Sequence, residues 1–196
     1  MTKIILATSS PYRQEAFRLL GLDFEAQSSD VDEYFAGRPN APQELVLHLA
    51  KLKAEAIAKD NDTGIIIGFD SVGWFNGQVL EKPKSRDDAF QRLKSLSGNS
   101  HQLYTGIYMK NLESGHDISR VVITDIEMRE LTDTEINKYL DQDSNVTSIC
   151  LGYDPLEHYS ATFVRKIEGS YNDLTRGIPL EVVVEMLPEV GYRYFS

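Results

Sequence analysis

The chain has 196 residues and a formal net charge of −10, with 41% hydrophobic and 26% charged residues. This composition is ordinary for a soluble globular protein and excludes a largely disordered chain. The acidic balance argues against a nucleic-acid polymer or an anionic membrane as partner, because both require a basic face, whereas a small anionic substrate needs only a local cluster of cations or a divalent metal.

The single cysteine, Cys150, excludes an internal disulfide and a cysteine-based zinc site, and its apolar surroundings predict a buried strand. The apolar run at the amino terminus is too short for a signal peptide, and no segment approaches the roughly 18 apolar residues of a membrane span. We therefore expect a cytoplasmic protein. Since no linker or repeat divides the chain, we expect a single domain over residues 1–196.

Hydrophobic periodicity, caps and turn residues predict alternating strands and helices. In chain order we expect a strand at 3–7, a helix at 12–20, a strand within 22–33, a helix at 43–59, a strand at 64–70, a hairpin at 74–80, a helix at 85–96, strands near 102–110 and 119–127, a helix at 132–140, extended segments at 146–152 and 160–167, and a closing helix at 179–187. Because several strand pairs are joined as hairpins, this alternation predicts an α/β fold with a mixed sheet.

The strand at 64–70 is the centre of the predicted site. Its three consecutive isoleucines indicate a strand buried on both faces, and its last residue is the carboxylate Asp70. Ligands of open α/β sheets bind beyond the strand ends, so an acid there can meet a substrate. The alternative is that Asp70 only caps a turn over residues 71–73.

The first strand-to-helix connection is a candidate anion site. Ser10 and Pro11 are typical of a helix start, and Arg13 follows within the first turn. Backbone N–H groups at a helix start, serine hydroxyls and an arginine together suit a phosphate group. An ordinary surface helix with the same residues is the alternative.

Three further charged residues have both a functional and an ordinary interpretation. Lys53 lies at the edge of the apolar face of its predicted helix, where lysines usually extend to water. Lys82 precedes Pro83, which holds it extended at the start of a loop. Glu33 could share a Mg²⁺ ion with Asp70, or it could be a plain turn residue.

A set of short motifs is ordered along the chain. These motifs are Leu6-Ala7-Thr8-Ser9-Ser10-Pro11-x-Arg13, Ser29-Asp30-Val31-Asp32-Glu33, Leu49-Ala50-x-x-Lys53-Ala54, Gly68-x-Asp70-Ser71, Lys82-Pro83, Leu96-Ser97-Gly98-x-x-His101-x-x-Tyr104-Thr105-Gly106 and Gly177-Ile178-Pro179-Leu180. The ordered set resembles the Maf family of nucleoside triphosphate pyrophosphatases. The resemblance covers nearly the whole chain.

The resemblance implies an elongated mixed β-sheet flanked by helices, with two lobes around a central cleft, related to the inosine triphosphate pyrophosphatases. It also implies hydrolysis of a nucleoside triphosphate to a monophosphate and pyrophosphate with a divalent metal, Mg²⁺ or Mn²⁺. The roles it implies are a general base at Asp70, phosphate-binding cations at Arg13, Lys53 and Lys82, a metal-side acid at Glu33 alongside Asp70, and further substrate contacts from Ser10 and Ser71.

Within the family, base preference separates two branches. Tyr12 resembles the aromatic residue of the 7-methyl-GTP branch, and Glu157 aligns with the glutamate of that branch. A methylated guanine is cationic, so an aromatic ring can stack on it, and a carboxylate can accept its N–H hydrogen bonds. The dTTP/UTP branch usually has an arginine in place of Tyr12 and a threonine in place of Ser71. The alternatives are a Tyr12 ring packed on its helix and Glu157 in solvent.

The resemblance therefore favours a housecleaning nucleoside triphosphate pyrophosphatase that acts on 7-methyl-GTP or another modified nucleotide. A dTTP/UTP pyrophosphatase and a non-catalytic nucleotide-binding regulator of cell division are the alternatives. A homodimer is expected from the habit of the family. One departure from the family pattern is Glu81, which stands where a glycine usually precedes the Lys-Pro pair.

Overall fold

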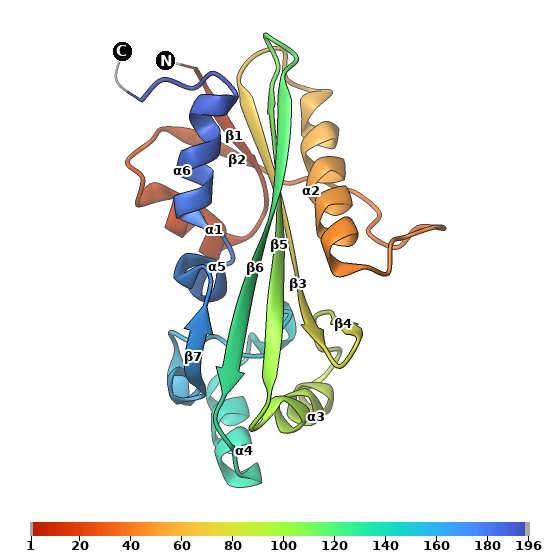
Figure 1. Cartoon of the computed structure of the whole chain (residues 1–196), viewed down its shortest axis with the longest axis vertical. Coiled ribbons are helices and arrows are strands. Elements are labelled where there is room, and N and C mark those ends of the chain that lie inside the picture. The colour runs from red at the N-terminus through yellow and green to blue at the C-terminus, as the bar shows by residue number, and fades with distance from the viewer. Residues whose placement is uncertain (1, 195–196) are drawn as a thin grey trace. The chain divides into compact units, whose positions relative to one another are not determined.

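The computed structural model describes residues 2–194 (Figure 1). The strands are β1 (Ile4–Ala7), β2 (Phe24–Gln27), β3 (Ile65–Phe75), β4 (Gln78–Leu80), β5 (Ser100–Asn111), β6 (Asp117–Met128) and β7 (Val164–Glu168). The helices are α1 (Pro11–Arg18), α2 (Pro42–Ala58), α3 (Arg86–Leu96), α4 (Asp133–Gln142), α5 (Tyr171–Arg176) and α6 (Leu180–Glu189), with short 3₁₀ helices η1 (Val146–Ser148) and η2 (His158–Thr162). No helix in this part of the chain is both long and apolar enough to cross a membrane.

The strands form one mixed sheet, which confirms the predicted fold class. Their hydrogen-bonded order is β2-β1-β3-β5-β6-β7, and β4 pairs with the far end of β3. β1 runs parallel to both β2 and β3, whereas β4 and β7 run antiparallel to their neighbours. The predicted hairpin at 74–80 is present, and its turn residues Asn76 and Gly77, between β3 and β4, both have positive φ, as a two-residue hairpin requires.

The chain divides into two compact units, as the expectation of two lobes implied. The first unit contains Met1–Asp70, Thr105–Val122 and Arg176–Ser196, and the second contains Ser71–Tyr104 and Ile123–Thr175. The central cleft stays a prediction.

In the first unit, both faces of the central strands are covered. Alternate residues of β1 and β3, such as Ile4 and Ile65, pack with α1 and α6, whereas Ile5 and Ile66 pack with α2. Figure 1 shows α1 and α6 on one side of these strands and α2 on the other. All three isoleucines of β3 are fully buried, which confirms the prediction of a strand buried on both faces.

Three stretches of the second unit differ from the sequence-based expectation. Residues 160–167 were expected to be extended throughout, but η2 continues to Thr162 and the strand β7 is confined to Val164–Glu168. Residues 146–152 were expected to be extended but form η1 and a turn, so Cys150 is a half-buried turn residue and not a buried strand residue. Val146 and Leu151 of this apolar run pack into the core of the second unit, although the run pairs with no described strand. The short helix α5 was also missed, since six residues offer too little periodicity to detect.

The core of the second unit contains one histidine, His101. It is 3% exposed, and its Nε2 lies 3.0 Å from the hydroxyl of Tyr153. Its Nδ1 has no hydrogen-bond partner among residues 2–194. Burial lowers the pKa of His101 from 6.5 to about 4. His101 thus has a structural position in the core of the second unit.

This depressed pKa predicts a loss of stability in acid. The unfolded chain binds a proton at His101 more tightly than the folded protein does. The stability that depends on neutral His101 is therefore fully present above pH 6.5. It is lost as the pH falls toward about 4, which lowers the free energy of unfolding by up to about 3 kcal/mol. We expect the free energy of unfolding of a His101→Gln variant, measured in denaturant from pH 8 to pH 4.5, to decline less steeply than that of the wild type. Equal slopes for the two proteins would contradict the prediction.

Candidate functional site

The start of α1 places an arginine beside the end of β1. Ser10 is the N-cap, its hydroxyl accepts the Arg13 backbone N–H at 3.4 Å, and Pro11 is in the first turn. The Ser10 backbone N–H in turn donates to the Thr8 hydroxyl at 3.1 Å. These local bonds fix the first turn of the helix, as the sequence predicts, and they direct Arg13 from a defined position.

The guanidinium of Arg13 is held by two backbone carbonyls. Its Nε donates to the Gly177 carbonyl at 2.7 Å, and its Nη1 donates to the Phe69 carbonyl at 3.4 Å. It also lies 5.8 Å from the centre of the Phe69 ring. The sequence pattern did not predict these two hydrogen bonds, although Gly177 belongs to one of the motifs that carry the resemblance. These two hydrogen bonds hold the positive charge of Arg13 close to Asp70, which follows Phe69 in the chain.

Two glycines let α2 lie directly on the sheet. A Cβ on Gly68 would come 2.1 Å from the Ala50 carbonyl oxygen, and one on Gly106 would come 2.4 Å from that of Val46. No other side chain fits at either place, because real Cβ atoms do not approach so closely. The backbone of α2 is therefore seated on β3 and β5 in one fixed register.

This seating brings together a lysine and two acids. Lys53 follows Ala50 within one turn of α2, and Asp70 lies on the same face of β3 as Gly68. The Lys53 ammonium is 2.6 Å from Asp70 Oδ1 and 2.8 Å from Glu33 Oε1. The side chains of Lys53 and Asp70 are only 14% and 9% exposed, whereas that of Glu33 is 43% exposed. Lys53 is thus an ion-pair partner and does not simply extend to water.

The electrostatic environment makes Asp70 a stronger base than an ordinary aspartate. Burial raises the pKa of its carboxyl, the charges of Lys53 and Arg13 act to lower that pKa, and the nearby Glu33 acts to raise it. The pKa is raised overall above its ordinary value of 3.8. A carboxylate that holds a proton more readily is better suited to general base catalysis.

Asp70 is not the last residue of its strand, which corrects the sequence-based prediction. β3 continues to Phe75 because it exchanges partners, pairing with β1 up to Gly68 and with β4 from Gly73. The alternative of a turn cap is also wrong, since Ser71 to Gly73 are in the strand. Asp70 nevertheless lies just beyond the carboxyl end of β1, which ends opposite Gly68, so an acid still follows the parallel part of the sheet.

The remaining predicted residues lie at several places. Tyr12 is half-buried in the first turn of α1, and Ser71 directly follows Asp70 in β3. Lys82 and Glu157 belong to the second unit, where both are exposed. Glu157 precedes η2, and its carboxylate is 3.9 Å from His158 Nε2. The roles assigned to these four residues stay predictions.

Two acidic residues, Glu33 and Asp70, are the candidates for binding a divalent metal ion. Within residues 2–194 no group of three or more histidine, cysteine, aspartate or glutamate side chains could hold an ion. Glu33 and Asp70, however, both contact the same ammonium, so their oxygens converge on one cation-sized position. Mg²⁺ commonly takes one or two protein carboxylates and completes its coordination with water and substrate phosphates. The pair therefore fits such an ion.

Comparisons with known proteins agree with the resemblance. The chain matches the family described as Maf-like protein over residues 3–190. It is 34% identical to a dTTP/UTP pyrophosphatase of Clostridium botulinum (strain Hall) over 194 residues, which cover 97% of this chain and 98% of the relative. It is 36% identical to a dTTP/UTP pyrophosphatase of Acetivibrio thermocellus over 198 aligned positions, with 97% and 96% covered.

The fold is also similar to a solved structure. The Ham1 protein of Staphylococcus aureus has a TM-score of 0.52 and 14% sequence identity, covering 95% of this chain and 98% of that protein. This likeness concerns the fold alone.

Proposed function

Because this chain belongs to the Maf-like protein family, we propose that it is a nucleoside triphosphate pyrophosphatase that cleaves the bond between the α- and β-phosphates. The observation that carries the proposal is the buried Asp70 carboxylate, held 2.6 Å from Lys53 and flanked by Arg13. A base beside fixed cations is what hydrolysis of a phosphoanhydride needs, since the water must lose a proton while negative charge grows on the phosphates.

Each residue has a defined task in this reaction. Asp70 accepts a proton from water as the water oxygen bonds to the α-phosphorus and the bond to the bridging oxygen breaks, so that pyrophosphate leaves with the electron pair. Oδ1 of Asp70 faces the cation position that Lys53 occupies in this structure, which leaves Oδ2 to take the proton. Arg13, Lys53 and Lys82 supply positive charge to the phosphate oxygens, as the family pattern implies.

Glu33 and Asp70 would hold a divalent ion, Mg²⁺ or Mn²⁺. When bound, the ion would neutralise charge on the phosphates and help to orient them. Their oxygens converge on the position that the Lys53 ammonium occupies in this structure, so the ion would take that place while Lys53 turned to the substrate phosphates. The other expectations for this enzyme, a cytoplasmic location, a homodimer and a housecleaning role, stay predictions.

Two substrate classes have support from different observations. The relatives that align over nearly the whole chain are named dTTP/UTP pyrophosphatases, which favours a pyrimidine nucleotide. Tyr12 in the first turn of α1 favours 7-methyl-GTP, because an aromatic ring can stack on a cationic base. Both classes share the triphosphate, so the phosphate chemistry above applies to either.

The test is release of pyrophosphate from a panel of 7-methyl-GTP, UTP, dTTP, CTP and ITP, each with Mg²⁺ or Mn²⁺. We expect release from 7-methyl-GTP or from UTP and dTTP, and we expect a chelator to abolish it and added metal to restore it. Faster release from UTP and dTTP would reject the preference for 7-methyl-GTP. If the protein bound a nucleotide but released no pyrophosphate from any member of the panel, the proposed enzymatic function would be wrong. The alternative of a non-catalytic nucleotide-binding regulator would then be favoured.

A further inference from the structure

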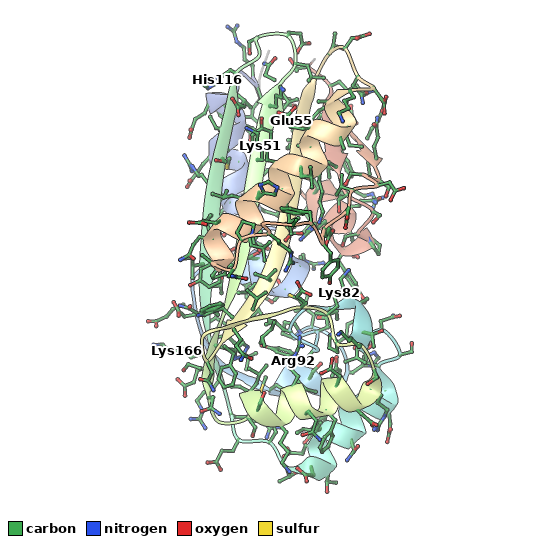
Figure 2. The ribbon with its side chains drawn as sticks, turned by 90° about the vertical axis from the view of Figure 1, so that its right-hand side faces the viewer. Lys51, Glu55, Lys82, Arg92, His116 and Lys166 are labelled. Atoms are coloured by element: carbon green, nitrogen blue, oxygen red, sulfur yellow. The ribbon has the colours of Figure 1, made fainter. Side chains whose placement is uncertain are left out.

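In the second unit, one arginine side chain joins two loops. Arg92 lies on α3, and its Nη1 donates to the backbone carbonyl of Glu81 and, at 2.5 Å, to that of Cys150. Hydrogen bonds from a charged donor are stronger than neutral ones. One guanidinium nitrogen therefore fixes the loop that precedes Lys82 to the turn after η1. Figure 2 shows Arg92 and Lys82 within this unit.

The two loops are also packed against each other. A Cβ on Gly152 would lie 3.4 Å from Pro83 Cγ and 3.8 Å from Arg92 Cδ. Gly152 has φ +80, a conformation that favours glycine, and Pro83 is buried. The turn that carries Cys150 and Gly152 thus lies next to both the proline and the arginine.

Lys82 lies between two residues, Glu81 and Pro83, whose positions are fixed by these contacts. On one side the Glu81 carbonyl is bonded by Arg92, and on the other Pro83 is buried and restricts Lys82 to an extended backbone. Two residues further on, the Lys84 backbone N–H donates to Asp88 Oδ2 on α3 at 2.8 Å. The backbone of Lys82 is therefore held at both ends, while its side chain is exposed.

A guanidinium suits this contact better than an ammonium. Arginine carries five N–H donors in a planar fork that can serve two carbonyls, whereas the lysine ammonium is smaller and rotates freely. Burial lowers the pKa of Arg92, and the negative charges of Asp88 and Glu81 act against that decrease. The side chain stays charged because arginine is not deprotonated in proteins.

We propose that Arg92 is a positioning residue for Lys82, holding the Glu81-Lys82-Pro83 loop against the turn at residues 150–152. The proposal rests on the proposed function, in which Lys82 brings positive charge to the substrate phosphates. A displacement of about 1 Å in such a group can cost about 10²-fold in rate. A residue that only stabilises the fold would leave the placement of Lys82 unaffected.

The test compares Arg92→Met with Arg86→Met. Arg86 is on the same helix and also uses one nitrogen for two acceptors, Asn137 at 3.2 Å and Asp141 at 2.6 Å, but neither acceptor is in a loop near Lys82. We expect Arg92→Met to lower kcat by about 10- to 100-fold with a smaller change in KM. Arg86→Met should leave both within about twofold, and Arg92→Lys should recover part of the loss. An equal loss in the Arg86→Met variant would overturn the proposal.

A double-mutant cycle separates positioning from general stability. In a Lys82→Met background, adding Arg92→Met should lower kcat by no more than about threefold, because the residue to be positioned is already gone. If the two losses multiplied instead, Arg92 would act independently of Lys82 and the proposal would be wrong. If Arg92→Met does not fold, the same cycle is carried out with Arg92→Lys.

Hydrogen exchange tests the loop without any substrate. The Lys84 amide is bonded to Asp88, and the Gly152 amide to the Ile149 carbonyl at 3.0 Å. Both amides should exchange about tenfold faster in Arg92→Met and should be unchanged in Arg86→Met. Unchanged exchange in Arg92→Met would overturn the proposal. If the wild type released no pyrophosphate from any nucleotide, the proposed function would fail, and this exchange alone would decide whether Arg92 holds the loop.

Discussion

Replacing the general base is expected to nearly abolish turnover. For Asp70→Asn we expect kcat to fall by about 10²- to 10⁴-fold at neutral pH, the range that a positioned base contributes. The amide keeps the shape of the side chain and can still accept from Lys53, but it cannot take a proton from water. We expect the free energy of unfolding to change by less than about 2 kcal/mol, because no cavity is created. Pyrophosphate release and denaturant unfolding measure the two effects.

Glu55→Gln is the matched control for this variant. Glu55 also lies in the first unit and accepts from lysine and tyrosine side chains, at 2.9 Å from Lys110 Nζ and 2.8 Å from the Tyr108 hydroxyl. Figure 2 shows it on α2, the helix that also carries Lys53. Removing this charge should affect stability slightly and turnover not at all. Comparable rates for Asp70→Asn and Glu55→Gln would exclude Asp70 from the proton transfer.

Local chemistry explains which parts of the fold could be predicted. The start of α1 follows from the Ser10 cap, and the start of α4 follows from the capping box of Thr132 and Glu135, which the structure contains. The turn at Asn76-Gly77 likewise follows from two residues that accept positive φ. In each case the deciding interactions are within four residues of one another, so the sequence pattern contains them.

Predictions based on the same local patterns failed where distant partners decide the structure. The polar residues at 70–71 suggest a strand end, but β3 continues to Phe75 in a sheet where one of its neighbours is β5, which follows only after α3. The apolar run at 146–152 suggests a strand, but no strand pairs with it, and the Cys150 carbonyl is bonded by Arg92. Strand continuation depends on available neighbours, which periodicity does not report.

The candidate site depends on distant contacts even more strongly. Lys53 and Asp70 are 17 positions apart, and their ion pair exists because Gly68 lets α2 lie on β3. From the residues alone, extension of Lys53 to water was the ordinary interpretation. Only the ordered set of motifs connected the two residues in advance, and the structure then supplies the 2.6 Å contact.

Removing Lys53 is expected to alter both the rate and its pH dependence. The charge and the hydrogen bond of Lys53 are the largest influences that lower the pKa of Asp70, so Lys53→Met should raise that pKa further. The base is then protonated over a wider acid range, and the acid limb of the kcat/KM profile should move to higher pH. Because a cation facing the phosphates is also lost, we expect the rate at pH 7 to fall by about 10²-fold or more.

The same variant should lose stability as the pH rises. With Lys53 absent, the folded-state pKa of Asp70 lies further above its unfolded value of 3.8, so the folded protein binds the proton more tightly than the unfolded chain. Its contribution is then complete below the unfolded pKa and is lost as the pH rises through the folded pKa. We expect the difference in unfolding free energy between wild type and Lys53→Met to grow from acid to neutral pH, which denaturant titrations can measure without substrate.

Lys51→Met is the control that separates the effect of the Lys53–Asp70 ion pair from the effect of losing one positive charge on α2. Lys51 is two residues away on the same helix (Figure 2), and its ammonium lies 5.3 Å from the centre of the Tyr108 ring. Its loss removes one positive charge from α2 but no ion pair to Asp70, so both the acid limb and the pH dependence of stability should stay at the wild-type values. If Lys51→Met moved the acid limb as far as Lys53→Met, the overall charge of the helix would set the pKa of Asp70. If neither variant moved it, the carboxylate that titrates in catalysis would not be Asp70.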